Sequence, residues 1–175
     1  MIAKINPDIL LDRESIRKRV IELGARISRE LRNRDLCVLP VMDGGMIFAA
    51  DLVREISLPL SIKPVKASSY LGKRSSSGKI TIPWGLPQCI KNKDLLLVDD
   101  ILDTGLTLGT LGELLLKEGA RSVRTCVLLR KESASHLQSD FIGFDIPDVF
   151  VVGYGLDLAG LYRNLPYVGV LERTA

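Results

Sequence analysis

Three stretches of the chain carry apolar residues three or four positions apart, the spacing that places side chains on one face of an α-helix. We predict helices over residues 12–35, 43–56 and 107–120. Asp12 is placed to cap the first helix and Gly119 to end the third, because glycine readily adopts the left-handed conformation that follows a helix. The apolar face of the first helix consists of Ile16, Val20, Leu23, Ile27 and Leu31. The residues of the second helix that we expect to face inward are Met46, Ala49, Leu52, Val53 and Ile56.

Short, continuously apolar runs alternate with these helices and predict strands that are buried on both faces. This alternation is typical of an α/β fold, and we predict a parallel sheet with helices on both faces. Pro40 lies inside the first run, and because proline has no N–H to donate to a sheet, we expect that strand to end irregularly. The predicted strands cover residues 36–42, 60–67, 94–99 and 122–129, followed by the short runs 141–144, 149–154 and 167–171.

The segment 68–81 differs from the rest of the chain, because it is rich in Ser, Gly and Lys and has no hydrophobic period. Two interpretations are open, an exposed surface loop and a mobile lid over a functional site. Long loops without secondary structure in compact domains are often functional, so we favour the lid.

Length and composition narrow the class of protein. A chain of 175 residues, 46% of them hydrophobic, is expected to fold as one domain with a substantial core. No apolar run reaches the roughly 18 residues that cross a bilayer, and the N-terminus lacks the basic-then-apolar layout of a signal peptide. We therefore expect a cytoplasmic protein with no membrane partner.

The charged and reactive residues argue against several kinds of chemistry. The net charge is +3 and the basic residues are spread along the chain, so we expect no nucleic-acid partner. His136 is the only histidine, which argues against His-based zinc sites and Ser-His-Asp triads. Cys37, Cys89 and Cys126 have no CxxC spacing and are expected to be reduced core thiols.

The strongest functional signal is LLLVDDILDTGLTLG, residues 95–109. A buried run ends in the adjacent acids Asp99 and Asp100, then a third acid, Asp103, precedes a hydroxyl-rich turn into a helix. The N–H groups at a helix N-terminus favour an anion. Two carboxylates would repel that anion, but they suit sugar hydroxyls, which donate hydrogen bonds, or Mg²⁺, which takes oxygen ligands. A sugar phosphate therefore satisfies both halves of the motif.

Two other interpretations of the motif are weaker. In one, the acids only cap a strand and a helix. In the other, LLLVDD resembles the opening of phosphoacceptor receiver domains, in which paired acids hold Mg²⁺. Those acids follow the first strand of a domain, and too few residues remain after Asp100 for the rest of one.

The same residues resemble a known family. LLLVDDILDTGLTL resembles the 5-phosphoribosyl diphosphate (PRPP) motif of the type I phosphoribosyltransferases. Residues 140–171 resemble the C-terminal region of the hypoxanthine-guanine branch of that family, residues 41–52 its pyrophosphate loop and residues 68–80 its lid. The resemblance covers about residues 36–172, most of the chain.

The resemblance implies an α/β fold, the type I phosphoribosyltransferase fold, with a mainly parallel sheet flanked by helices. The chain would form a single domain, residues 1–175, with a core of about 34–135. A small hood would be built from about 1–12 and 140–175. The mobile lid would be 68–81.

In the PRPP motif, the resemblance implies that Asp99 and Asp100 hold the ribose 2- and 3-hydroxyls, directly or through Mg²⁺. Asp103 has a second role, because the attacking base loses its N7 proton and a nearby carboxylate can accept it. The residues that would wrap the 5-phosphate are Asp103, Thr104, Gly105, Leu106 and Thr107.

The leaving pyrophosphate would meet backbone N–H groups of Met42, Asp43 and Gly44, with a non-proline cis peptide bond as a possible feature of this loop. Asp43 departs from the family, in which many members carry Lys or Arg at this position, and an acid beside pyrophosphate is unfavourable unless its side chain turns away or meets Mg²⁺. The resemblance also implies that Ser69 and Tyr70 of the lid and Arg163 contact the pyrophosphate.

The purine would stack on Phe150, and the backbone of Val151 would contact its edge. Lys131 would donate to the oxygen at purine position 6, with Arg130 as the alternative, because the segment after Lys131 is about two residues shorter than in related chains. Asp157 would lie at the purine site and hold a second Mg²⁺. Read locally, Phe150 has the pattern of a core residue.

The resemblance thus implies a Mg²⁺-dependent purine salvage enzyme. It would transfer the phosphoribosyl group of PRPP to N9 of hypoxanthine or guanine, giving IMP or GMP and pyrophosphate. The alternatives are a xanthine-preferring relative and a nucleotide-sensing, RNA-binding regulator with the same fold. A homodimer or homotetramer is expected, with the helix over 44–56 as its contact.

Overall fold

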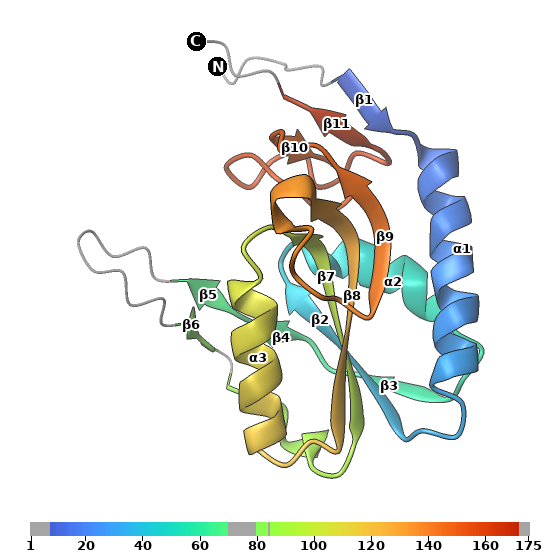
Figure 1. The fold of residues 1–175 in the computed structure, drawn as a ribbon, viewed down its shortest axis with the longest axis vertical. Coiled ribbons are helices and arrows are strands. Elements are labelled where there is room, and N and C mark those ends of the chain that lie inside the picture. Colours follow the sequence, from blue (N-terminus) through green and yellow to red (C-terminus); the bar gives the residue numbers. More distant parts are fainter. Residues whose placement is uncertain (1–7, 70–79, 84, 172–175) are drawn as a thin grey trace.

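The computed structural model describes residues 8–69, 80–83 and 85–171, and its centre is a sheet of parallel strands (Figure 1). Its helices are α1 (Arg13–Glu30), α2 (Gly45–Glu55) and α3 (Leu106–Lys117), with short 3₁₀ turns at Gln88–Ile90 and Glu132–Ala134. Its strands are β1 (Asp8–Leu11), β2 (Leu36–Met42), β3 (Leu60–Ile62), β4 (Val65–Lys66), β5 (Ser68–Ser69), β6 (Ile80–Thr81), β7 (Asp94–Leu102), β8 (Ser122–Lys131), β9 (Phe141–Ile146), β10 (Val151–Val152) and β11 (Val168–Val170).

The central sheet has the strand order β3-β2-β7-β8-β9, and every neighbouring pair is parallel. The prediction of a mainly parallel α/β sheet is confirmed. The strand predicted over 60–67 is instead two short strands, because β3 and β4 pair separately with β2. Pro40 does not end β2 irregularly as predicted, since it pairs with Val98 of β7 and lies where β2 has no paired residue of β3 or β4 beside it.

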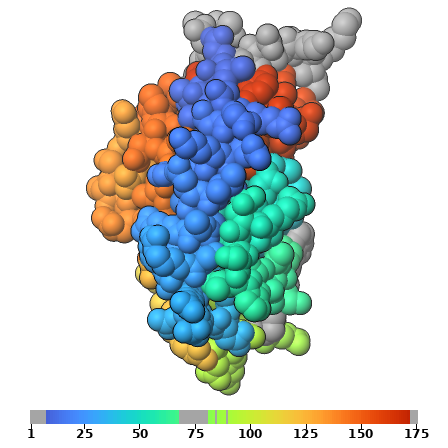
Figure 2. All heavy atoms as spheres, turned by 90° about the vertical axis from the view of Figure 1, so that its right-hand side faces the viewer, coloured from blue at the N-terminus to red at the C-terminus, as the bar shows by residue number. Residues whose placement is uncertain are grey.

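Alternate residues of the strands supply two separate cores, one on each face of the sheet. On one face, Val38 and Leu96 pack with α1 and α2, which lie side by side in Figure 2. On the other, Leu39 and Leu97 pack with α3. The predicted arrangement of helices on both faces is therefore confirmed. Cys37 and Cys126 are buried in these cores, as expected.

The helices begin largely as the sequence predicts. The carboxylate of Asp12 accepts a hydrogen bond from the Ser15 N–H at 2.7 Å, so it caps α1. In α2, Met46 was expected to face inward but is 44% exposed, whereas Phe48 is fully buried. Ala49, Leu52 and Ile56 are buried as predicted, and the buried stripe of α2 includes Gly45 and Phe48 rather than Met46.

A second, antiparallel sheet has the order β1-β11-β10 and lies at the end of the molecule near both termini (Figure 1). It joins the beginning and the end of the described chain and forms the hood that was predicted. The residue limits of core and hood stay predictions. None of the helices in the described ranges is long and apolar enough to cross a membrane.

Candidate functional site

The carboxyl ends of the central parallel strands meet at one edge of the sheet, where ligands bind in open α/β folds. The Met42–Gly44 segment follows β2, and Asp103 follows β7. Lys131 is the last residue of β8. β7 continues to Leu102 rather than ending at residue 99 as predicted, so Asp99 and Asp100 lie within the strand.

Asp99 and Asp100 form a pair of acids, of which Asp99 is buried and Asp100 is partly buried. Asp99 is 9% exposed, and one of its carboxylate oxygens accepts the N–H of Asp100 at 3.0 Å. Burial raises the pKa of the Asp99 carboxyl well above its usual range, and the charge of Asp100 raises it further. Burial also raises the pKa of Asp100. Such a pair is suited to a ligand that brings hydrogen-bond donors or a cation.

Two adjacent glycines make room for this acid pair. Gly44 packs against the carboxylate of Asp100, and a side-chain carbon there would overlap it. A side-chain carbon on Gly45 would lie 2.7 Å from the Val98 carbonyl oxygen and 3.0 Å from Asp99 Cα. The sequence analysis predicted a backbone role for Gly44 and missed Gly45. The feature that could have indicated Gly45 is the pair of adjacent glycines at the start of the predicted helix.

The turn after Asp103 surrounds a cavity of about 250 Å³. Gly105 has a φ of 72° and comes directly before α3, so the first N–H groups of the helix follow a left-handed turn. The Leu106 N–H donates to the Thr104 hydroxyl at 3.4 Å. The cavity is lined by Asp99, Asp100, Ile101, Leu102, Asp103, Thr104, Gly105, Thr107 and Leu108. Leu106, predicted with this turn, does not line it.

A second cavity, of about 210 Å³, shares Asp100 and Asp103 with the first. It brings together the four residues predicted at the purine site, Lys131 at the end of β8 and Phe150, Val151 and Asp157 from the later segment around β10. Phe150 is 42% exposed, because β10 begins one residue after it, so it is not the core residue that the local pattern suggests. The lining residues are Asp100, Ile101, Asp103, Lys131, Val149, Phe150, Val151, Leu156 and Asp157.

Lys131 and Arg130 point to different partners. The Lys131 ammonium lies 2.9 Å from a carboxylate oxygen of Asp103 and lines the second cavity. The Arg130 guanidinium donates instead to Asp145 of β9, at 2.6 Å. Arg130 does not line that cavity. The geometry therefore favours Lys131 for contact with a ligand there.

The loops that follow β2 and β10 each contain residues that form an ion pair. Lys66 lies 3.1 Å from Asp43, and Arg163 lies 2.7 Å from Asp157. Arg163 also donates to the carbonyl of Gly155, a residue that packs against the carbonyl of Gly44. The peptide bond between Met42 and Asp43 is cis. The sequence analysis missed Lys66, since nothing in its local pattern distinguishes it from a surface lysine.

Two predicted site residues cannot be placed in this geometry. Tyr70 lies outside the described residues, as do residues 71–79 of the predicted lid. Ser69 is described only as part of β5, whose pairing with β6 joins the two ends of that segment. The predicted contacts of Ser69 and Tyr70 therefore stay predictions.

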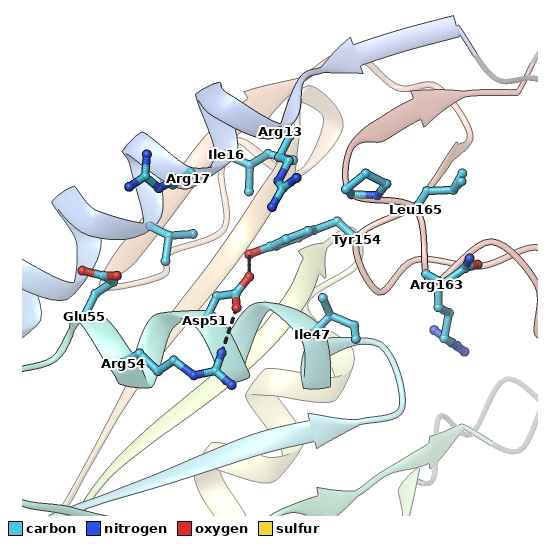
Figure 3. Close-up of a pocket in the computed structure, with 13 residues that line it drawn as sticks. Arg13, Ile16, Arg17, Ile47, Asp51, Arg54, Glu55, Tyr154, Arg163 and Leu165 are labelled. Atoms are coloured by element: carbon cyan, nitrogen blue, oxygen red, sulfur yellow. Dashed lines mark hydrogen bonds and ion pairs between the residues drawn. The ribbon is translucent and has the colours of Figure 1, made fainter.

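A larger cavity, of about 530 Å³, lies between α1, α2 and the hood (Figure 3). Three of its polar groups are bonded to each other: the Tyr154 hydroxyl donates to Asp51 at 2.7 Å, and Arg54 donates to the other oxygen of Asp51 at 3.0 Å. Of the predicted site residues, it contains only Arg163. Size alone does not make it the site, because the acids and the anion-binding turn are elsewhere.

Comparison with known proteins identifies the family. The model of the family described as "Phosphoribosyl transferase domain" matches residues 7–158 of this chain. The hypoxanthine-guanine phosphoribosyltransferase of Bacillus subtilis (strain 168) is 41% identical over 166 residues, which cover 94% of this chain and 92% of that protein. A crystal structure of a hypoxanthine phosphoribosyltransferase from Staphylococcus aureus has a TM-score of 0.88 at 39% identity, covering 94% of this chain and 91% of that one. A hypoxanthine-guanine phosphoribosyltransferase from Bacillus anthracis has a TM-score of 0.88 at 35% identity, covering 94% and 98%. This chain belongs to the phosphoribosyltransferase family.

Proposed function

We propose that this protein transfers the 5-phosphoribosyl group of PRPP to N9 of hypoxanthine or guanine, giving IMP or GMP and pyrophosphate. The curated relatives of similar length named hypoxanthine-guanine phosphoribosyltransferase support this activity. The observation that carries it is the pair of adjoining cavities that share Asp100 and Asp103. One suits a sugar phosphate and the other a flat base, so Asp103 would stand where the two are joined.

The ribose phosphate fits the first cavity. Its phosphate would accept hydrogen bonds from the N–H groups of the turn before α3 and from the hydroxyls of Thr104 and Thr107. Its 2- and 3-hydroxyls would donate to Asp99 and Asp100, whose charged forms are disfavoured by burial and are favoured by such donors. This placement leaves C1 of the ribose directed toward the second cavity.

The acidic residues at the strand ends also suit Mg²⁺. Carboxylates are oxygen ligands, which Mg²⁺ prefers, and it often binds through one or two of them together with substrate phosphates. The described part of the chain contains no preformed group of three or more metal-binding side chains, so the substrate would complete the coordination. Asp99, Asp100 and Asp157 are the residues we propose to hold Mg²⁺, which would neutralise the charge developing on pyrophosphate.

The second cavity is suited to bind a 6-oxo purine and accept its proton. Phe150 offers an exposed aromatic face on which a base can stack, and the backbone of Val151 would contact the purine edge. The Lys131 ammonium can donate to the 6-oxo group. As N9 bonds to the ribose carbon, the N7 proton would pass to Asp103, which acts as general base.

The leaving pyrophosphate would lie against the backbone of Met42, Asp43 and Gly44 and the guanidinium of Arg163. Arg163 is held beside this loop by its bonds to Asp157 and Gly155. We also propose that Ser69 and Tyr70 close over the pyrophosphate and exclude water from the reaction.

The activity is tested by measuring pyrophosphate release with PRPP, Mg²⁺ and hypoxanthine, guanine, xanthine or adenine. We expect release with hypoxanthine or guanine and none with adenine. Preference for xanthine would move the assignment to the xanthine-preferring alternative, and no release with any base would contradict the proposal.

Replacing Lys131 with alanine is expected to weaken discrimination against adenine. Adenine carries an amino group at position 6, which cannot accept the lysine proton, and sites built on such a bond reject the wrong base strongly. The ratio of kcat/KM for hypoxanthine to that for adenine should fall at least about tenfold. Arg130→Ala is the matched control and should leave the ratio unchanged; a shift in that variant instead would assign the contact to Arg130.

Replacing Gly44 with alanine is expected to raise the KM for PRPP about tenfold or more, because the new methyl group would occupy the position of the Asp100 carboxylate. The carboxylate can turn aside, so the melting temperature should change little. Gly45→Ala should instead lower stability by about 1–3 kcal/mol, since its methyl group meets backbone atoms. Gly109→Ala, in an open position of α3, is the control for both. An unchanged KM for PRPP in Gly44→Ala would contradict the expected displacement.

We further propose a cytoplasmic homodimer or homotetramer that uses the exposed face of α2. Met46 lies on that face and is 44% exposed, so a subunit contact through α2 would cover it. Met46→Glu is expected to lower the mass measured by light scattering. An unchanged oligomer would place the contact elsewhere.

A further inference from the structure

An ion pair that the sequence did not predict borders the proposed pyrophosphate loop. The Lys66 ammonium lies 3.2 and 3.1 Å from the two carboxylate oxygens of Asp43. The two residues meet because β4 pairs with β2, with Lys66 directly opposite Met42. Gly44, which follows Asp43, packs against the carboxylate of Asp100, so Asp43 is one residue from a contact with the acid pair.

Asp43 poses an electrostatic problem at this position. The backbone beside it is proposed to bind pyrophosphate, and a carboxylate there would repel that anion. The side chain of Asp43 is 50% exposed and turned to Lys66, which is 31% exposed. A neighbouring cation that neutralises the acid removes much of the repulsion. It also brings a positive charge to a loop that carries none of its own.

Two other cations of the site have the same arrangement. Lys131 is paired with Asp103, and Arg163 with Asp157. Each of these cations is proposed to contact a substrate, and each is paired with a carboxylate in the structure. Lys66 is the third member of this set, and no substrate contact has been assigned to it.

We propose that Lys66, which is paired with Asp43 in the structure, is a pyrophosphate-binding residue. This inference rests on the proposed function and extends it. A lysine ammonium has three donors, so Lys66 can donate to a pyrophosphate oxygen when the ligand enters and exchange one of its bonds to Asp43 for it. Asp43 is then a partner that competes with the ligand for Lys66, and its negative charge, which would disfavour the ligand, is balanced by Lys66 in the structure.

The alternative is an ordinary surface ion pair, which contributes little. Titration of inorganic pyrophosphate by calorimetry, with Mg²⁺ and with EDTA, separates the two. For Lys66→Met we expect a Kd for pyrophosphate at least tenfold higher than in the wild type. Lys63→Met, an exposed lysine of the same edge segment, is the matched control and should leave this Kd unchanged. Equal affinity in Lys66→Met and wild type would overturn the proposal.

Two further measurements separate a ligand contact from a general loss of structure. GMP binds through the base and the 5-phosphate, so its Kd should change less than twofold in Lys66→Met. In EDTA, Asp43→Asn should bind pyrophosphate more tightly than the wild type, because the variant removes both a repelling charge and a competitor for Lys66. A parallel loss of GMP and pyrophosphate affinity, or weaker pyrophosphate binding in Asp43→Asn, would contradict the proposal.

The pyrophosphate titration needs neither a purine nor turnover, so it is independent of the test of activity. If the wild type forms no nucleotide but pyrophosphate binding depends on Lys66, the proposed function fails and the assignment of Lys66 stands. If nucleotide forms and Lys66→Met binds pyrophosphate normally, only the assignment of Lys66 fails.

Discussion

Asp103→Asn is expected to lower kcat by about 10²–10⁴-fold, the usual contribution of a positioned general base. Asparagine keeps the shape of the side chain and can still accept one hydrogen bond, but it cannot take the N7 proton of the purine at neutral pH. The phosphate-binding turn is otherwise intact, so the KM for PRPP should change less than about threefold. Steady-state kinetics with hypoxanthine as the base measure both quantities.

Asp145→Asn is the matched control for this variant. Asp145 is also an acid paired with a cation at the end of a parallel strand, but it bonds to Arg130 and lines neither cavity. Its substitution should leave kcat within about twofold. Losses of similar size in kcat and in PRPP affinity for Asp103→Asn would assign Asp103 to binding rather than to proton transfer.

The parts of the fold and site that the sequence predicted well depend on local patterns. The run that ends in Asp99 and Asp100 fixes a buried strand, and the turn at Gly105 fixes the start of a helix, within a few residues of each other. Because the carboxyl ends of parallel strands meet at one edge, this motif also predicted the edge of the sheet at which the two cavities lie. The ranges of the strands were less accurate, since β7 extends three residues past its predicted end.

The features that the sequence did not predict depend on residues far apart in the chain. Lys66 and Asp43 are brought together only by the pairing of β4 with β2. Gly45 is required by the backbone of β7, which a local pattern does not reveal. The exposure of Met46 depends on which face of α2 packs on the sheet. Met46 and Phe48 are both apolar, and only the tertiary structure shows that Phe48 is the buried one. Each of these needs the tertiary structure, because a periodic pattern specifies a face and not its neighbour.

The double variant Asp99→Asn/Asp100→Asn is expected to be more stable than the wild type but to have a much lower affinity for PRPP. The two residues are adjacent, Asp99 buried and Asp100 partly buried, and burial raises the pKa of both carboxyls, so their charged forms are disfavoured in the folded protein. Neutral amides of the same shape remove this cost, so the free energy of unfolding in EDTA at pH 7 should rise by about 1 kcal/mol. This is the usual size of a single stabilising change. Urea denaturation measures it.

The same change should remove PRPP binding in the presence of Mg²⁺. Hydrogen bonds to charged groups contribute about 1.5–3 kcal/mol each, so loss of two charged acceptors predicts an increase in the Kd for PRPP of about a hundredfold or more. Asp51→Asn/Asp145→Asn, which removes two acids outside both strand-end cavities, is the control for net charge. It should bind PRPP as the wild type does. A double variant at 99 and 100 that is less stable than the wild type would show that the acids support the fold, and one that retains PRPP affinity would place the ribose elsewhere. Stability and PRPP affinity are expected to change in opposite directions for a single reason. The desolvation that disfavours the charged acid pair in the folded protein also strengthens the hydrogen bonds that the pair makes to a sugar.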